Sequence, residues 1–317
     1  MAGNPAFSNS PAFSSNPQRA GQFGQQQYGQ QAYGQQPYGQ APQAPQFGQQ
    51  QGYGAPYGQQ QPGFGTPDQL EQQYGRPSAT PLDTERLTYD GVIMKTVATL
   101  GVTAIGFVVT LGMLFVSGTS GLFYLLTYGG ALVGFVLALV NIFKKEPSRT
   151  LVLAYGLAQG FFLGGISGIL EFGVGLTGII FQALLATACV FAATLALYAF
   201  RIVRTSPRLN KIFFIVMIGY ALFSVVNLVL MLTGVNQDPW GLRSQPIFGI
   251  PLGVLLGGLA VLLGAYSLVM DFEGVENGVK RGAPAKYGWS AAFGITMTII
   301  WLYVEILRII AIVRGNN

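Results

Sequence analysis

Histidine is absent from this sequence of 317 residues, and cysteine occurs once, at Cys189. Histidine is the commonest general base and the commonest ligand of transition metals, so its absence argues against zinc-dependent hydrolysis. A single cysteine cannot form a disulfide within the chain. No phosphate-cradling glycine loop is present either, which argues against coupling to ATP. We therefore expect no bound cofactor.

Charged residues are also scarce, at 9% of the chain against 50% for hydrophobic residues. From residue 91 onward the apolar residues form runs close to the length of about 20 residues that crosses a bilayer as a helix. Such a pattern predicts an all-α, polytopic membrane protein embedded in a lipid bilayer. Seven spans are predicted, at residues 91–116, 121–143, 150–170, 176–200, 212–232, 247–270 and 287–313.

Lysine and arginine concentrate in alternate loops between these spans, whereas the other loops carry only Arg243. Basic residues beside a span stay on the cytoplasmic side of the membrane. We therefore expect a cytoplasmic N-terminus and, with seven spans, a C-terminus outside. Because the basic residues lie at span ends and form no exposed stripe, the net charge of +5 does not indicate nucleic-acid binding.

Residues 1–85 differ from the rest, because they are low in complexity and rich in Gln, Gly, Pro and Tyr. Aromatic residues recur there at intervals, and several are followed by glycine. Such a composition buries too little apolar surface to offset the entropy of ordering, so we expect a disordered cytoplasmic tail before a membrane domain at 86–317. Two interpretations stay open: a solvated tether, or a segment whose spaced rings promote self-association or recruit a partner.

Glycines at four-residue intervals mark two of the predicted spans. Small residues let membrane helices approach closely, so such stripes predict tightly packed helix pairs. Pro251 is expected to bend the sixth span near its outer end. The packing glycines are Gly156, Gly160, Gly164 and Gly168 in the third span, and Gly249, Gly253 and Gly257 in the sixth.

Acidic residues in or beside spans are the candidate functional residues, because burying an ionised side chain at mid-bilayer costs roughly 2.5–3.5 kcal/mol on insertion scales. Glu171 lies at an outer span end, where a structural role is expected. Glu273 and Glu276 follow the sixth span, where a solvated helix face is expected. Glu305 lies deep in the last span, three residues before Arg308. It either pairs locally with Arg308 or shares a site with Asp271, which would raise one carboxyl pKa.

Enzymatic functions find little support in the membrane part. An intramembrane aspartyl protease needs paired aspartates within spans, and Asp271 is the one candidate, with no Gly-x-Gly-Asp sequence present. A retinal-type pigment needs a lysine in the last span, which has none. We therefore expect that the protein is not an enzyme.

Four segments near the C-terminus are similar to a known family: Asp271-Phe-Glu-Gly-Val-Glu276, Gly282-Ala-Pro, Tyr287-Gly-Trp-Ser-Ala-Ala-Phe-Gly and Trp301-Leu-Tyr-Val-Glu-Ile-Leu-Arg308. Together they resemble the bacterial, YccA-like branch of the Bax inhibitor family, the transmembrane Bax inhibitor motif proteins. Residues 155–167 resemble that family's third-helix motif Glu-Gly-x-x-Leu-Gly. The resemblance covers residues 87–314 and leaves the tail unmatched.

The resemblance implies a seven-helix bundle with the last helix central, in a bacterial plasma membrane, and a pH-sensitive calcium leak. The implied latch is a carboxylate pair at the positions of Asp271 and Glu305, which would also bind calcium transiently. Three positions depart from the calcium-leak members: Glu305 stands in place of Asp, Arg308 in place of Asn and Gln159 in place of Glu. A permanent cation at Arg308 favours the ionised form of Glu305.

Two functions therefore compete at the level of the sequence. The first is a pH-sensitive ion leak, most simply for calcium, in which carboxylates supply the oxygen ligands that a hard cation prefers. The second, which the resemblance also allows, is a non-conducting membrane regulator that binds a membrane quality-control protease or another stress-response partner. The sequence indicates no particular oligomeric state.

Overall fold

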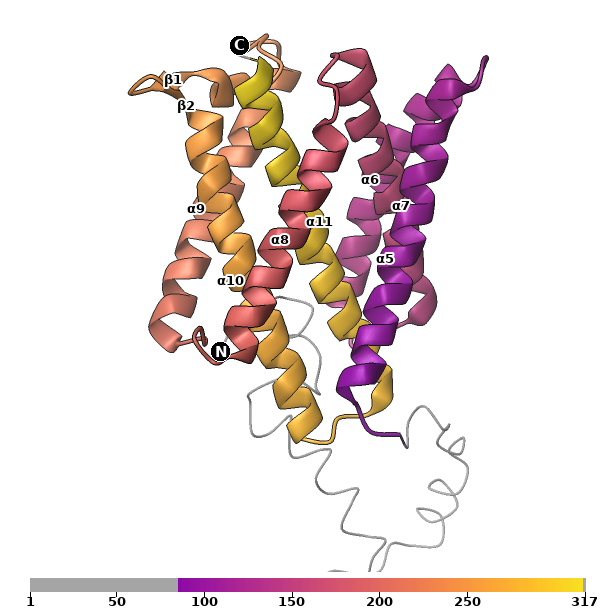
Figure 1. Ribbon diagram of the computed structural model, residues 1–317, viewed down its shortest axis with the longest axis vertical. Coiled ribbons are helices and arrows are strands. Elements are labelled where there is room, and N and C mark those ends of the chain that lie inside the picture. Colours follow the sequence, from indigo (N-terminus) through magenta and orange to yellow (C-terminus); the bar gives the residue numbers. More distant parts are fainter. Residues whose placement is uncertain (1–84, 316–317) are drawn as a thin grey trace, which may run out of the picture.

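The computed structural model describes residues 85–315, so the predicted disordered tail lies outside the described residues except for Glu85. Within the described range, seven helices are long and apolar enough to cross a membrane (Figure 1). This confirms the predicted all-α, multi-pass membrane protein. The helices are α5 (Tyr89–Gly112), α6 (Ser120–Phe143), α7 (Arg149–Gly168), α8 (Ile179–Ala199), α9 (Pro207–Leu232), α10 (Leu252–Lys280) and α11 (Gly288–Gly315).

Short elements extend or connect these helices. A 3₁₀ turn, η1 (Met113–Phe115), continues α5, and a π-helical turn, η2 (Ile169–Gly173), continues α7. Two further 3₁₀ turns are η3 (Gly241–Ser244), between α9 and α10, and η4 (Ala285–Tyr287), directly before α11. Strands β1 (Pro246–Ile247) and β2 (Ile250–Pro251) form an antiparallel hairpin in which Ile247 pairs with Ile250.

This hairpin corrects the prediction for the sixth span. Residues 247–251 are not helical, and Pro251 lies directly before α10 and does not bend it. Phe248 and Gly249 form the hairpin turn, and both have positive φ angles, of 52° and 80°. Glycine adopts such an angle easily because it has no Cβ. Gly249 therefore does not pack between helices, and a Cβ added there would meet nothing within 4 Å. At its other end α10 continues past Met270 to Lys280.

The two ends of the bundle differ in charge. Loops 144–148, 200–206 and 281–287 share one end with the start of α5, and we call this the basic end. The β1–β2 hairpin and the end of α11 lie at the opposite end, at the top of Figure 1, which we call the hairpin end. The basic loops that alternate along the sequence thus all lie at one end of the bundle.

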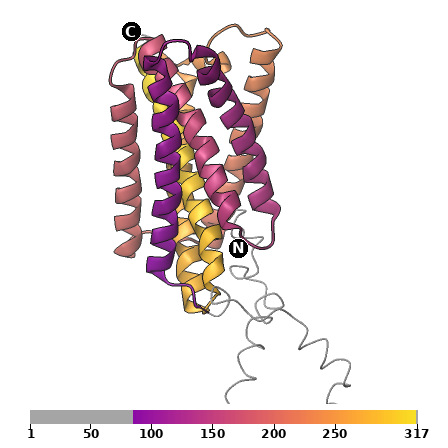
Figure 2. The ribbon, with the colours of Figure 1, turned by 90° about the vertical axis from the view of Figure 1, so that its right-hand side faces the viewer.

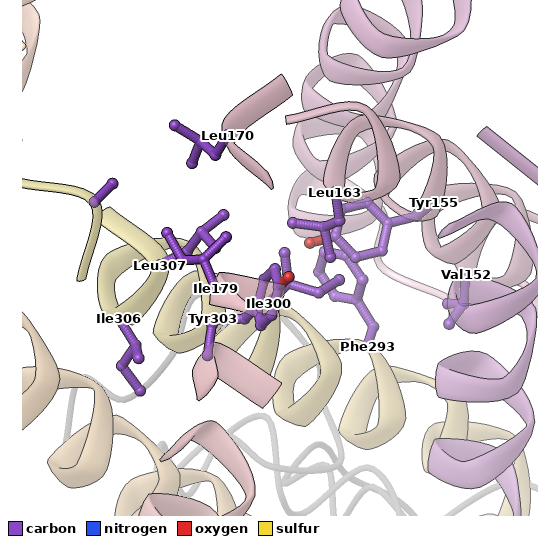
Figure 3. Close-up of a cluster of buried hydrophobic side chains, with 12 residues drawn as sticks. Val152, Tyr155, Leu163, Leu170, Ile179, Phe293, Ile300, Tyr303, Ile306 and Leu307 are labelled. Carbon is purple, nitrogen blue, oxygen red and sulfur yellow. The ribbon is translucent and has the colours of Figure 1, made fainter. Parts of the chain in front are cut away.

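The last helix is the central one. The apolar window of α11 is 61% buried, against 56% for α7, 44% for α10 and 17–22% for the other four spans. Figure 2 shows α11, in yellow, running through the bundle among the other helices. Its side chains join those of α7 and α8 in the largest buried apolar cluster (Figure 3), in which the rings of Tyr155 and Phe293 meet edge to face at 4.9 Å.

The glycine stripe of α7 lies against α5. A Cβ added to Gly160 would lie 2.2 Å from the carbonyl oxygen of Thr103, and one added to Gly164 would lie 2.3 Å from that of Phe107. Gly106 of α5 approaches α7 in the same way. The two backbones are therefore close enough that only glycine fits.

The remaining stripe glycines also lie at helix contacts. Gly156 faces Thr99 and Thr103 of α5, and Gly168 faces the leucines near the end of α5 and η1. In α10, Gly253 and Gly257 lie under Ile312 and Ile309 of α11. Both helices that carry a stripe therefore pack closely against a neighbour, α7 against α5 and α10 against the central helix.

Candidate functional site

Glu305 is buried in the bundle and is held by groups from three elements. Its side chain is 3% exposed. One carboxylate oxygen, Oε1, accepts hydrogen bonds from the Tyr220 hydroxyl of α9 at 2.6 Å and from Nη1 of Arg308 at 2.7 Å. The other, Oε2, lies 3.8 Å from Nη1 of Arg243 in η3. The predicted local pair with Arg308 is thus part of a larger cluster.

Arg243 joins this cluster from a connection between helices and not from a membrane span. It lies in the connection between α9 and α10 and is 4% exposed. Its guanidinium donates to the Tyr220 hydroxyl at 3.2 Å and to Oγ of Ser224 at 2.9 Å. It also lies over the rings of Tyr220 and Phe223, at 5.3 and 5.5 Å from their centroids. The connection therefore folds back into the bundle to bring a cation to Glu305.

Asn227 fixes the connection in this position. Its Oδ1 accepts a hydrogen bond from the backbone N–H of Leu242 at 2.6 Å, and its Nδ2 donates to the carbonyl of Trp240 at 3.3 Å. Gly241 adopts a φ of 63°, and a Cβ there would lie 2.3 Å from Oδ1 of Asn227. The only sequence signal for this arrangement is that Arg243 is the sole basic residue in the loops of the hairpin end.

A cleft with a volume of about 940 Å³ opens beside this cluster. Its lining includes polar groups of α9, η3 and α11, among them Ser224, Arg243, Glu305 and Arg308. Apolar side chains of α6, α7 and α9 and the rings of Trp240 and Trp301 also line it. Oε2 of Glu305 is buried and makes no hydrogen bond within the described residues. Counting Arg243 and Arg308 against Glu305, the cluster carries one net positive charge.

Asp271, on α10, lies beside a different part of the central helix. It is fully buried in α10, and its Oδ2 accepts a hydrogen bond from the Thr298 hydroxyl at 2.8 Å. Thr298 precedes Glu305 by seven residues of α11, which is about 10 Å along a helix axis. Asp271 is not among the residues that line the cleft beside Glu305. In this structure the two carboxylates have different partners at different depths, so they do not form the shared pair proposed from the sequence.

Two other acidic residues connect elements at the basic end. Glu276 accepts hydrogen bonds from Arg204 at 2.7 Å, from Lys280 at 2.6 Å and from the Tyr198 hydroxyl. Its side chain is 15% exposed, so the expected solvated face is largely covered. The bond to Glu276 raises the pKa of the Arg204 guanidinium above its ordinary value. Glu273 accepts a hydrogen bond from Thr205. Together these contacts attach the α8–α9 loop to the extension of α10.

The last two candidates lie at helix contacts. Glu171, in η2, accepts hydrogen bonds from the backbone N–H groups of Gly178 at 3.0 Å and Ile180 at 3.1 Å, so it caps the start of α8. Gln159 of α7 faces α6, where a Cβ added to Gly134 would lie 2.7 Å from its Nε2. Both therefore lie outside the Glu305 cluster.

Among residues 85–315, no group of three or more cysteine, aspartate or glutamate side chains is arranged to hold a metal ion. Transient calcium contact at Asp271 or Glu305 stays a prediction from the sequence.

Comparison with known proteins gives one match. A family model described as Bax inhibitor 1 like matches residues 4–315, and so includes most of the tail that the resemblance in motifs leaves out. Neither the search of curated proteins nor the search of solved structures gives a match. With nearly its whole length covered by the family model, the chain belongs to the Bax inhibitor 1 like family.

Proposed function

We propose that the protein is a passive, pH-sensitive ion leak of the membrane, with calcium as its cargo, and that the Glu305 cluster is its closed gate. The observation that carries the proposal is the clamping of a buried carboxylate on the central helix by Arg243, which comes from a connection, and by Tyr220, which comes from a peripheral helix. A gate needs such a contact between elements that are able to separate.

Protonation of Glu305 is the proposed trigger. Removing one partner from a buried ion pair leaves the other charge uncompensated, which costs about 3–5 kcal/mol. A neutral Glu305 would leave the buried Arg243 in that condition and the partly exposed Arg308 without its partner, and both guanidiniums would then move toward water. Acidification therefore favours release of the η3 connection and α9 from α11, and the leak opens as the pH falls.

Asp271 has a different role in this proposal. It is a buried acid beside the central helix on the side of the basic end, where carboxylate and hydroxyl oxygens of Asp271, Thr298 and Ser267 lie together. Oxygen ligands are those that calcium prefers, and a negative charge attracts a cation that approaches along the helix. Asp271 would thus select for cations, whereas Glu305 would control opening.

The orientation follows from the charge of the two ends. Because basic loops are retained in the cytoplasm, the basic end and the N-terminus would face the cytoplasm of a bacterial cell, with the hairpin end and the C-terminus outside the plasma membrane. Calcium would then enter down its gradient without an energy source.

One observation favours the alternative, a non-conducting regulator that binds a membrane quality-control protease or another stress-response partner. The residues just before α5 pair with the α10–α11 loop: the N–H of Leu87 donates to Ala283 and that of Ala285 to Glu85, each at 2.7 Å. The residues that connect the tail to α5 are therefore hydrogen-bonded directly to the loop that leads into the central helix. A partner bound to the tail would act on α11 through this contact.

Flux through reconstituted protein separates the two functions. The purified full chain would be placed in liposomes that contain a calcium-sensitive dye, beside protein-free liposomes. We expect calcium entry with the wild type, less entry with Asp271→Asn, and more entry at neutral pH with Glu305→Gln. Glu146→Gln is the control, because this side chain is 71% exposed at the basic end. No flux at any pH from correctly folded protein would reject the leak and leave the regulator.

A further inference from the structure

The cleft beside Glu305 contains an acceptor and donors that the protein itself does not satisfy. Oε2 of Glu305 is buried without a hydrogen bond, as noted above. Arg308 uses only Nη1 in its hydrogen bonds to Glu305 and Tyr220, so its Nε and Nη2 make none within residues 85–315. Buried polar groups in proteins are nearly always hydrogen-bonded. The buried Oε2 therefore indicates a donor on a ligand. The Arg308 side chain, which is 23% exposed and lines the cleft, offers donors to an acceptor on the same ligand.

The charges of the cleft define the ligand further. With two arginines and one glutamate, the cleft has a charge of +1 and is best neutralised by a ligand of charge −1. Arginine binds phosphate oxygens with paired, charge-assisted hydrogen bonds. A carboxylate oxygen only accepts, so the group that meets Oε2 must donate. A phosphodiester with a hydroxyl in its head group has the charge of −1, the phosphate oxygens and the donor. A zwitterionic head group with an amine would instead bring a further cation beside the two arginines.

The shape of the cleft indicates that this ligand is a lipid. Its apolar wall is formed by Ile166, Met217, Ala221, Leu228 and Met231, and Leu228 is 54% exposed on the outer surface of α9. The cleft therefore borders the region of the hydrocarbon chains. Arg308 lies in the second half of α11 (Gly288–Gly315), so the polar groups of the cleft belong to the half of the bundle nearer the hairpin end.

We propose that the cleft binds an anionic phospholipid with a hydroxyl-bearing head group, of the phosphatidylglycerol type, from the leaflet at the hairpin end. Its phosphodiester contacts the free donors of Arg308, near the positive charge of Arg243. Its hydroxyl donates to Oε2 of Glu305, and one acyl chain lies on the apolar wall. The site does not depend on ion conduction, because a non-conducting protein would bind the same lipid.

Tryptophan fluorescence provides a direct test, since Trp240 and Trp301 line the cleft. The third tryptophan, Trp289, lies at the basic end near Lys95 and Arg149, so a Trp289→Phe background reports on the cleft alone. This full-length protein would be placed in phosphatidylcholine bilayers with a minor fraction of lipid with brominated chains. We expect brominated phosphatidylglycerol to quench the tryptophan fluorescence with an apparent affinity about fivefold or more above that of brominated phosphatidylcholine. One charge-assisted hydrogen bond provides a difference of this size. Equal quenching by the two lipids overturns the proposal.

Variants and competitors identify the contacts. Arg308→Gln should remove the preference and Arg308→Lys should keep part of it, whereas Arg314→Gln, at the exposed end of the same helix, should keep all of it. Brominated phosphatidylmethanol has the same charge but no head-group hydroxyl, and we expect it to bind more weakly than phosphatidylglycerol. Equal affinity of these two lipids overturns the contact to Glu305. Relief of quenching by soluble glycerophosphate would overturn the lipid as occupant in favour of a soluble phosphate ester.

Discussion

The Tyr220 hydroxyl donates to Glu305 at 2.6 Å, and this bond joins the least buried of the seven spans to the most buried. The window of α9 is 17% buried and that of α11 is 61% buried. Apolar packing alone therefore attaches α9 weakly, and the polar cluster at Glu305 supplies a specific contact. An element attached in this way is suited to move when one charge changes.

Replacement of Tyr220 by Phe should loosen this attachment. The ring and its packing beside Trp301 remain, but Glu305 and Arg243 each lose a hydrogen-bonding partner. We expect a loss of about 1–3 kcal/mol in the free energy of unfolding, the range for a buried partner left unsatisfied. Thermal unfolding in detergent measures this. Phe214→Leu, a change in α9 outside the cluster, serves as the control, and an equal loss in both variants would contradict the special role of Tyr220.

Gly160→Ala should destabilise the α5–α7 contact. The new methyl group would lie 2.2 Å from a backbone oxygen of Thr103, which cannot move aside as a side chain would. Overpacking of this kind costs typically about 1–3 kcal/mol. Gly258→Ala is the matched control within a helix, since a Cβ there meets nothing within 4 Å. We expect a lower unfolding temperature for the first variant alone, and unchanged stability in both would show that the helices are not in close contact.

Glu171→Ala should weaken the start of α8, because two backbone N–H groups lose their acceptor. The expected loss is about 1 kcal/mol, the typical value for a helix cap. Glu146→Ala removes an exposed carboxylate whose pair with Lys286 spans 3.4 Å, and such pairs contribute about 0–1 kcal/mol. Amide hydrogen exchange at residues 179–183 would detect the loss locally. Faster exchange there in the Glu146 variant, and not in the Glu171 variant, would contradict the cap.

Arg243→Gln should increase the leak at neutral pH. The variant removes the cation that η3 brings to Glu305 while it keeps a group that donates hydrogen bonds to Tyr220 and Ser224. Calcium entry into liposomes measures the change, with Arg314→Gln as the control for loss of charge at the hairpin end. Entry equal to that of the wild type would exclude Arg243 from the gate.

Local patterns predicted much of this architecture. Apolar length defined seven spans, and the four-residue spacing of Gly160 and Gly164 indicated a close helix contact. The three-residue separation of Glu305 and Arg308 indicated their pair. In each case the interacting groups lie on one helix or repeat along it, so the sequence contains the geometry directly.

Other features depend on tertiary contacts and were not predictable in this way. The run 247–251 is as apolar as a span, and apolar length does not distinguish a hairpin from a helical turn. Glu171 meets the N–H groups of α8 because η2 turns the chain back, and Arg243 meets Glu305 although 62 residues separate them (305 − 243). Long-range pairs of this kind are set by how connections fold onto the bundle, which no local spacing records.

The pH dependence of calcium flux through the wild type and Glu305→Gln tests the central claim most directly. Charged or titratable groups face Glu305 from α9, η3 and α11, as Tyr220, Arg243 and Arg308, and the ionised carboxylate holds them together. We predict wild-type flux that rises as the pH falls, and flux through Glu305→Gln that is high and independent of pH. Equal pH dependence in both proteins would contradict Glu305 as the gate.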